Sequence, residues 1–258
     1  MADPTVLRSD RGRVRFLTLN RPHVRNAINT ATMRLLHDEL RRTVEDALIR
    51  VIVLDAKGGI AFSAGGDIAE MKTFTPLSAD TLMETWQKAL ECIARSPKPV
   101  IAAIDGFAYG GGTELAMACH IRVASEAASF AQTEIALDHL PGGGGTQRLP
   151  RLVPLGFAYE HLLLGDPIPA QEAWRIGLVN HVWPRAEFAE RTLALAERIA
   201  DRAPTAVRFT LEAIREGLNG TLDSGLRLER AMAGLVLESD EARKGLEEFL
   251  AKKRKARK

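Results

Sequence analysis

Glu114 stands where a glycine-rich turn enters a helix, a position that suits acid–base chemistry beside a bound anion. It ends the stretch Gly106–Glu114, which follows the apolar run Val100–Ile104 and leads into the helical pattern of Leu115–Cys119. A strand, a glycine turn and a helix start in this order place unpaired N–H groups at one edge of a sheet, where they can bind negative charge. Because glycine has no Cβ atom, a ligand can lie directly against this backbone. The alternative is an ordinary strand-to-helix turn in which Glu114 only complements the helix dipole.

Two further glycine-rich loops occur in the chain. One of them, Gly58–Asp67, directly follows the apolar run Val51–Asp55. The other, Pro141–Thr146, leads into Gln147–Pro150. This last loop lacks the Lys-Ser or Lys-Thr pair of a phosphate-binding P-loop, so its likeness to one is superficial.

The apolar pattern predicts strands that alternate with helices, followed by helices only, which is typical of an α/β core with a helical C-terminal region. We therefore predict a core over residues 1–195 and a helical region over residues 196–258. Strands are expected at Arg13–Asn20, Val51–Asp55, Val100–Ile104, Ile121–Ala124 and the end of Gly177–Val182. Helices are expected after the cap Asn29–Thr30, near Ala79–Ala94, from about Gly112, at Ala170–Trp174 and from about Phe188 onward, with breaks at Pro204, Gly220 and Asp240.

The bulk composition is that of a globular protein. With 258 residues and 46% hydrophobic content, the chain can bury a large core. No apolar run reaches the length of a membrane span, and Met1–Thr5 lacks the apolar core of a secretory signal. Cys92 and Cys119 lie in apolar helical patterns, which favours buried thiols over a disulfide or a metal pair. We expect a cytoplasmic protein with no membrane contact and no metal.

Positive charge is concentrated at the C-terminus. Six of the seven residues of Lys252–Lys258 are basic, which leaves a net charge of −4 on the rest of a chain whose total is +2. A nucleic-acid-binding protein usually carries its positive charge across a folded face. The sequence therefore predicts a solvated tail and no nucleic-acid partner, with an RNA-binding protein as a distant alternative.

The glycine loops and the carboxylates Glu114 and Glu134 together resemble the enoyl-CoA hydratase/isomerase (crotonase) superfamily. The resemblance covers nearly the whole chain, with the motifs in order and at the family's spacing. The matching strings are Asn20–Pro22, Asn26–Asn29, Phe62–Ile68, Lys98–Ala103, Gly106–Glu114, Gln132–Ile135, Leu140–Gly142, Gly145–Leu149 and Gly177–Val179.

The resemblance implies a crotonase-like core, which is a spiral of ββα turns, followed by C-terminal helices used in trimerisation. Members of the family act on acyl-CoA thioesters and bind the thioester oxygen in an oxyanion hole of two backbone N–H groups, whose positions match Gly66 and Gly111. In its hydratases two glutamates face the reacting carbons, and Glu114 and Glu134 fill both positions. Because two close carboxyl groups do not ionise equally, Glu114 can act as the base and Glu134 as the acid, or the two can share this work around one water.

The family also implies contacts with the CoA part of the substrate. The loop Ala64–Ile68 is expected to receive the adenine through backbone groups. The glycine loop Pro141–Thr146 is expected to contribute one further contact, at Gly142. A C-terminal Phe-x-x-Lys pattern touches CoA in relatives, sometimes across subunits. The expected substrate-binding residues are Ala64, Asp67, Ile68, Gly142, Phe249 and Lys252.

The implied function is an enoyl-CoA hydratase, which adds water syn across the double bond of a 2-enoyl-CoA thioester. It needs no cofactor, since CoA is part of the substrate, and the protein is expected to be a homo-oligomer, either a trimer or a dimer of trimers. A Δ3-Δ2-enoyl-CoA isomerase is the nearest alternative, because one glutamate suffices to move a proton, and another crotonase-type acyl-CoA enzyme is also an alternative. A non-catalytic CoA-binding relative is more distant. Two departures from the family concern the site: Thr133 replaces a common proline, and Asp138 a common glycine. We expect Asp138 and His139 to face solvent; the alternative is that they line the pocket, which would indicate a substrate other than a plain fatty acyl chain.

Overall fold

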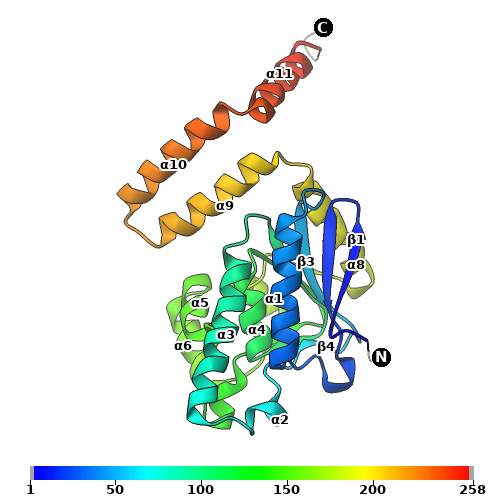
Figure 1. Ribbon diagram of the computed structural model, residues 1–258, viewed down its shortest axis with the longest axis vertical. Helices are drawn as coiled ribbons and strands as arrows, with labels where there is room; N and C mark the ends of the chain where they lie inside the picture. The colour runs from blue at the N-terminus through cyan, green and yellow to red at the C-terminus, as the bar shows by residue number, and fades with distance from the viewer. Residues whose placement is uncertain (1–2, 256–258) are drawn as a thin grey trace.

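The computed structural model describes residues 3–255, apart from the side chains of Pro76, Leu77, Lys252, Arg254 and Lys255. Two β-sheets and the helices around them form the body, from which the last helices extend (Figure 1). The strands are β1 (Val6–Arg11), β2 (Val14–Leu19), β3 (Val51–Ala56), β4 (Ala61–Ser63), β5 (Val100–Ile104), β6 (Phe107–Tyr109), β7 (Ile121–Ser125), β8 (Ser129–Ala131), β9 (Ile168–Pro169) and β10 (His181–Trp183). The α-helices are α1 (Thr30–Glu45), α2 (Ile68–Met71), α3 (Pro76–Ala94), α4 (Gly111–Ala118), α5 (Gly145–Leu152), α6 (Leu155–Leu164), α7 (Ala170–Arg175), α8 (Arg185–Ala200), α9 (Pro204–Leu218), α10 (Leu222–Leu237) and α11 (Asp240–Lys255), and the 3-10 helices are η1 (Pro22–Val24) and η2 (Thr133–Leu137).

The larger sheet has the strand order β1-β2-β3-β5-β7-β10 and is parallel except for the β1–β2 pair. Because side chains alternate between the two faces of a strand, this sheet contributes to two separate cores. Val53 and Ile101 pack with Phe188 of α8 on one face. Their neighbours Ile52 and Ala102 belong to the core that also includes residues of α1, α3 and α4. These three helices lie side by side over the sheet (Figure 1).

The smaller sheet has the order β4-β6-β8-β9, in which β4, β6 and β8 are parallel and β9 is antiparallel. Each of the three parallel strands follows a strand of the larger sheet after a short connection, and each is followed by a helical segment. The units are β3-β4-α2, β5-β6-α4 and β7-β8-η2. This repetition is the predicted spiral of ββα turns, and the predicted fold class is confirmed.

Local signals explain where the helices that flank the site begin. Asn29 caps α1, because its side chain accepts a hydrogen bond of 2.9 Å from the N–H of Thr32. Thr75 and Ser78 form a capping box at the start of α3, and Pro76 occupies the first turn, where it removes no helical hydrogen bond. The capping box sets the residue at which α3 begins. The buried side chain of Trp86 on this helix reaches the glycine-rich turn at Gly111.

The C-terminal helices α9 and α10 form a helical hairpin that lies apart from the sheets, and α11 continues beyond it (Figure 1). The breaks between them fall at the predicted positions, and Thr221 caps α10 by accepting a hydrogen bond from the N–H of Ser224. The division of the chain after residue 195 stays a prediction, since α8 spans this point and packs on the larger sheet. Within residues 3–255 we find no helix with the length and apolar character needed to cross a membrane.

The structure confirms the predicted strands and adds some that the sequence did not predict. The strand β1 is polar along most of its length, and β4, β6, β8 and β9 are too short to show a period. The helix predicted near Ala79 already begins at Pro76. Both cysteines are free thiols: Cys119 is buried, as predicted, whereas Cys92 is half-buried.

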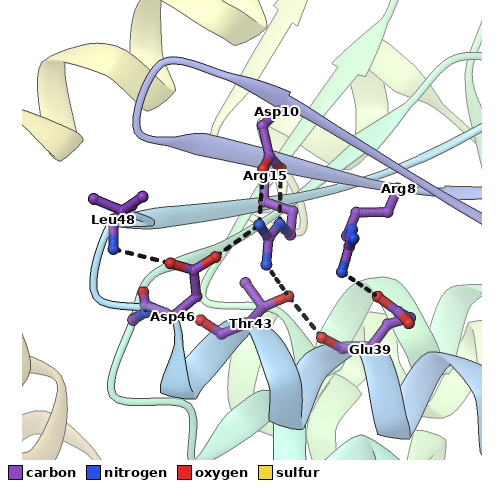
Figure 2. A network of polar contacts seen from close by, with 8 residues as sticks. Arg8, Asp10, Arg15, Glu39, Thr43, Asp46 and Leu48 are labelled. Carbon is purple, nitrogen blue, oxygen red and sulfur yellow. Dashed lines mark hydrogen bonds and ion pairs between the residues drawn. The ribbon is translucent and has the colours of Figure 1, made fainter.

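A buried arginine connects the β1–β2 hairpin with the end of α1 (Figure 2). Arg15 is 5% exposed, and its guanidinium donates two hydrogen bonds of 2.7 Å to the carboxylate of Asp10 and one of 2.8 Å to Asp46. Bidentate pairs of this kind are strong and directional. The hydrogen bond from Arg15 lowers the pKa of Asp10. The N–H of Leu48, and after it Arg15, lowers the pKa of Asp46.

We expect Asp10→Asn to make folding less dependent on pH. Because the pKa of Asp10 is lower in the folded than in the unfolded protein, its carboxylate adds stability above the unfolded pKa, and this stability is lost as the pH falls through the folded pKa. The variant should have a lower free energy of unfolding at about pH 7 and a smaller loss on going to about pH 3. Urea denaturation at both pH values measures this. Asp80→Asn, on an exposed position of α3, is the control, and equal pH dependence in the two variants would contradict the expectation.

Candidate active site

Three loops meet at one edge of the smaller sheet. Because β4, β6 and β8 are parallel neighbours, their carboxyl ends lie at the same edge. Each strand runs directly into a segment that the sequence analysis singled out: Ala64–Asp67 after β4, Gly110–Glu114 after β6 and Gln132–Glu134 after β8. The carboxyl ends of parallel strands are a common place for ligands in α/β proteins. The fold therefore brings the predicted catalytic segments together.

The amides of Gly66 and Gly111 lie close to one another. A Cβ atom placed on Gly111 would lie 3.5 Å from the amide nitrogen of Gly66. Ile28 pairs with Gly66, but its hydrogen bonds go to the residues on either side, Gly65 and Asp67. Gly111 is the first residue of α4, where an N–H has no partner within the helix. Among the described residues neither amide has an acceptor, so both can donate to an incoming oxygen.

Glu114 is buried under the third glycine loop. Its side chain lies on α4, the residue is 2% exposed, and Oε1 accepts hydrogen bonds of 2.8 Å from the N–H groups of both Gly143 and Gly145. Gly144 between them has a φ of 111°, which favours glycine and allows the loop to turn tightly around the carboxylate. A Cβ atom on Gly143 would lie 2.5 Å from Oε2 of Glu114. The glycines are therefore needed for this close approach.

Glu134 lies on η2, against the turn that carries the Gly111 amide. Its Oε1 is 3.1 Å from the place that a Cβ atom of Gly110 would occupy, and the carbonyl of Gly110 accepts a hydrogen bond of 3.1 Å from the N–H of Glu114. Its Oε2 is buried and has no hydrogen-bond partner among the described residues. An unpartnered carboxyl oxygen in a buried place favours the neutral acid.

The two glutamates differ in their tendency to ionise. Burial raises the pKa of Glu134 to about 7, and the negative charge of Glu114 raises it as well. Burial also raises the pKa of Glu114, but the N–H groups of Gly145 and Gly143 and the positive charge of Arg148 act in the opposite direction. Two N–H donors from the third glycine loop stabilise the ionised form of Glu114, whereas Oε2 of Glu134 has no partner among the described residues, so Glu114 loses its proton first. The pair can therefore hold one carboxylate and one carboxylic acid near neutral pH.

Apolar side chains from α2 and α3 surround the amides. Two ring atoms of Trp86 lie 2.6 Å and 2.7 Å from the place that a Cβ atom of Gly111 would occupy. The sulfur of Met71 lies 3.1 Å from the corresponding place at Gly66, and Met83 contacts Gly142 in the same way. An apolar surrounding strengthens the attraction between an amide dipole and a negative oxygen.

The loop that was predicted to bind CoA has several of its polar groups engaged within the chain. Asp67 forms an ion pair of 2.9 Å with Arg21 and caps α2. The N–H of Ala64 donates to the carbonyl of Arg25 at 3.0 Å, whereas Ile68 is 50% exposed. The side chain of Asp67 therefore has a structural role, and the predicted contacts of this loop with CoA stay a prediction.

The remaining substrate-binding candidates lie in different places. Gly142 belongs to the third glycine loop, and its carbonyl accepts a hydrogen bond of 2.9 Å from Gln87. Phe249 is 63% exposed on α11, which lies at the far end of the molecule from α3 and α4 (Figure 1). Within one chain Phe249 is not part of this site. The side chain of Lys252 lies outside the described residues.

Asp138 has a backbone conformation that favours glycine. It ends η2 with a φ of 58°, in the left-handed region where glycine has no steric cost and Asp is one of the better tolerated residues. Both Asp138 and His139 are exposed, so the prediction that they face solvent is confirmed.

Sequence reasoning missed the residues that hold the side chain of Glu114 in position. The sequence analysis identified the loop Pro141–Thr146 but did not pair Gly143 and Gly145 with Glu114, because the contact spans 29 and 31 positions. It also assigned no role to Arg148, whose guanidinium donates a hydrogen bond of 2.6 Å to the carbonyl of Gly143. Its place within the Gly145–Leu149 motif was the available signal.

The ββα spiral places the chain among the proteins with a crotonase fold. A sequence profile of the family described as enoyl-CoA hydratase/isomerase matches residues 10–257, and the chain belongs to this family. It is 37% identical to the crotonyl-CoA hydratase of Syntrophomonas wolfei over 98% of both chains, and 38% identical to the 2,3-dehydroadipyl-CoA hydratase of Escherichia coli over 93% of both. The crystal structure of an enoyl-CoA hydratase from Bacillus anthracis matches with a TM-score of 0.93 at 37% identity, over 96% of each chain.

We expect Gly143→Ala to destabilise the protein. The added methyl group would meet Oε2 of Glu114 at 2.5 Å and would force apart the loop and the carboxylate. Overpacking of this kind costs about 1–3 kcal/mol. Urea denaturation measures the change. Gly156→Ala on α6 is the matched control, because a Cβ atom there meets nothing within 4 Å and alanine favours helix. A Gly143→Ala variant as stable as the Gly156→Ala variant would show that the loop can move away without cost.

Proposed function

We propose that the protein hydrates 2-enoyl-CoA thioesters. The observation that carries this proposal is the pair of glutamates with opposite preferences for a proton, beside two amides that are free to bind an oxygen. Hydration needs these three functions together: a base for water, an acid for the α carbon, and donors for the charge that develops on the thioester oxygen. The hydratase names of the similar proteins from Syntrophomonas wolfei and Escherichia coli agree with this choice.

In the proposed reaction Glu114 acts as the general base. It takes a proton from water while the water oxygen bonds to the β carbon, and the electron pair of the double bond moves towards the thioester carbonyl. Glu134 then donates its proton to the α carbon, which gives a 3-hydroxyacyl-CoA. The glutamates end with their protonation states exchanged, so one proton must pass from Glu114 to Glu134, directly or through water, before the next turnover.

The amides of Gly66 and Gly111 are proposed to bind the thioester oxygen. During the reaction this oxygen gains enolate character, and donors already in place need no rearrangement to stabilise it. Loss of one such donor typically costs about 3–4 kcal/mol of transition-state stabilisation. The dipole at the N-terminus of α4 acts in the same direction. The backbone of Ala64–Ile68 and the third glycine loop at Gly142 would then bind the rest of the thioester.

We expect Glu114→Gln and Glu134→Gln each to lower the hydration of crotonyl-CoA by about 10²-fold or more, because each removes one positioned acid–base group. Absorbance of the conjugated double bond measures the rate. Calorimetric titration with saturated butyryl-CoA measures binding, which should survive in both variants. Glu160→Gln on the exposed face of α6 is the control. A loss below about tenfold in either variant would mean that another group carries the proton.

Double-bond isomerisation is the alternative that the same site allows, since one glutamate can move a proton between two carbons. Presenting a 3-enoyl-CoA to the protein distinguishes the two activities. Appearance of the conjugated thioester faster than hydration of crotonyl-CoA would favour the isomerase.

We infer that the protein is a homo-oligomer, a trimer or a dimer of trimers. The support is an apolar groove of about 690 Å³ between α9 and α10, with Leu218 and Leu222 82% and 79% exposed at its end. An exposed apolar groove flanked by exposed leucines is consistent with an interface between subunits. The distance of α11 from the site is a second indication, because Phe249 could contact CoA only in another subunit.

Leu218→Glu together with Leu222→Glu should dissociate this oligomer, because the two charges would be buried at the interface. Light scattering after size-exclusion chromatography measures the mass. Leu48→Glu, 77% exposed and not among the residues that line the groove, is the control and should leave the mass unchanged. A monomeric unmodified protein would overturn the inference.

A further inference from the structure

Arg148 lies directly behind the third glycine loop. It comes from α5, its side chain is 21% exposed, and its Nη1 donates a hydrogen bond of 2.6 Å to the carbonyl of Gly143. On its other side Nη2 lies 3.8 Å from the carboxylate of Glu91 on α3. A Cβ atom on Gly144 would collide with the guanidinium. In this arrangement the guanidinium occupies the space that a Cβ atom of residue 144 would need.

Arg148 and Glu114 are connected through a single residue. Gly143 accepts a hydrogen bond from Arg148 with its carbonyl and donates one of 2.8 Å to Glu114 with its N–H. A displacement of Arg148 would release the Gly143 carbonyl and with it the N–H groups on the carboxylate. Among the described residues Arg148 and Glu114 form no direct ion pair, so the second oxygen of Glu114 stays available to accept a proton.

Two charged side chains interact with Glu114 among the described residues, and they come from different elements. Glu134 faces it from η2, and Arg148 from α5. Arg148 in turn faces Glu91 of α3 and Cys119 at the end of α4. The strands β4 and β6 that pack on α4 carry no charged side chain. After the N–H groups of Gly145 and Gly143, the positive charge of Arg148 offsets a further part of the effect of burial on the Glu114 carboxylate.

We propose that Arg148 is a positioning residue for the general base: it fixes the Gly143–Gly145 loop on Glu114, and its positive charge keeps Glu114 ionised without binding it directly. This proposal rests on the function proposed above. A bare buried carboxylate would take up a proton, and a directly paired one would be a poor base. Arg148 contacts Glu114 only through Gly143, so its charge favours the ionised carboxylate while leaving it free to accept a proton.

The pH dependence of kcat/KM for crotonyl-CoA tests the proposal. In the unmodified protein kcat/KM should fall at low pH as Glu114 gains a proton, and at high pH as Glu134 loses one, above its pKa of about 7. In Arg148→Met the fall at low pH should move up by about one pH unit, because an opposite charge is lost. The fall at high pH should stay in place, since Glu134 interacts with Glu114 rather than with Arg148. The maximum value of kcat/KM should fall about tenfold or more, because the Gly143–Gly145 loop is no longer held on Glu114.

Two variants separate charge from mere packing. Arg148→Lys keeps the charge, so its fall at low pH should coincide with that of the unmodified protein while the maximum stays reduced. Arg151→Met is the matched control, because Arg151 also donates from α5 to a backbone carbonyl, that of Gln147, but is exposed. An unshifted fall at low pH in Arg148→Met, or an equal shift in Arg148→Lys or Arg151→Met, would overturn the proposal.

A measurement without substrate keeps the proposal independent of the reaction. The carboxyl signal of Glu114 in protein labelled with ¹³C at the glutamate side chains can be assigned by its loss in Glu114→Gln. Its titration midpoint should lie higher in Arg148→Met than in the unmodified protein, and an unchanged midpoint would refute the electrostatic role. Failure of the unmodified protein to hydrate any enoyl-CoA would instead overturn the proposed function.

Discussion

The parallel pairing of β4, β6 and β8 is the constraint on which the site depends. These strands have three residues each, yet their pairing brings the loops after Ser63, Tyr109 and Ala131 to one edge. Strands this short cannot stand alone. They are held by the larger sheet, because each follows one of its strands after only a short connection. The large cores on either face of that sheet therefore stabilise the site indirectly.

Burial has opposite consequences at different points of this edge. It strengthens the donors at Gly66 and Gly111 by excluding water, and it makes the proton of Glu134 harder to lose. The same burial would neutralise Glu114 without the loop that donates two N–H groups to it. The third glycine loop is thus the element that turns two similar carboxyl groups into a base and an acid.

The sequence predicts the elements of this fold better than their contacts. Apolar periodicity located β2, β3, β5 and β7 and most helices, and family motifs selected Glu114 and Glu134 before any geometry was known. It could not locate β4, β6 and β8, because a strand of three residues contains no measurable period. Nor could it pair Gly143 with Glu114 or Arg148 with Gly143. Those contacts follow from how α4 and α5 pack together, and no local pattern encodes that packing.

Cys119 shows how burial makes this interior compatible with thioester chemistry. The residue follows α4 and is 3% exposed, and burial raises the pKa of its thiol to about 12. Only a thiolate attacks a thioester efficiently. A sulfur at the end of the helix that carries Glu114 would otherwise threaten self-acylation, in which the acyl group leaves CoA for the protein. Because burial favours the protonated thiol and encloses it, Cys119 is protected from reaction with the kind of molecule that this family of proteins handles.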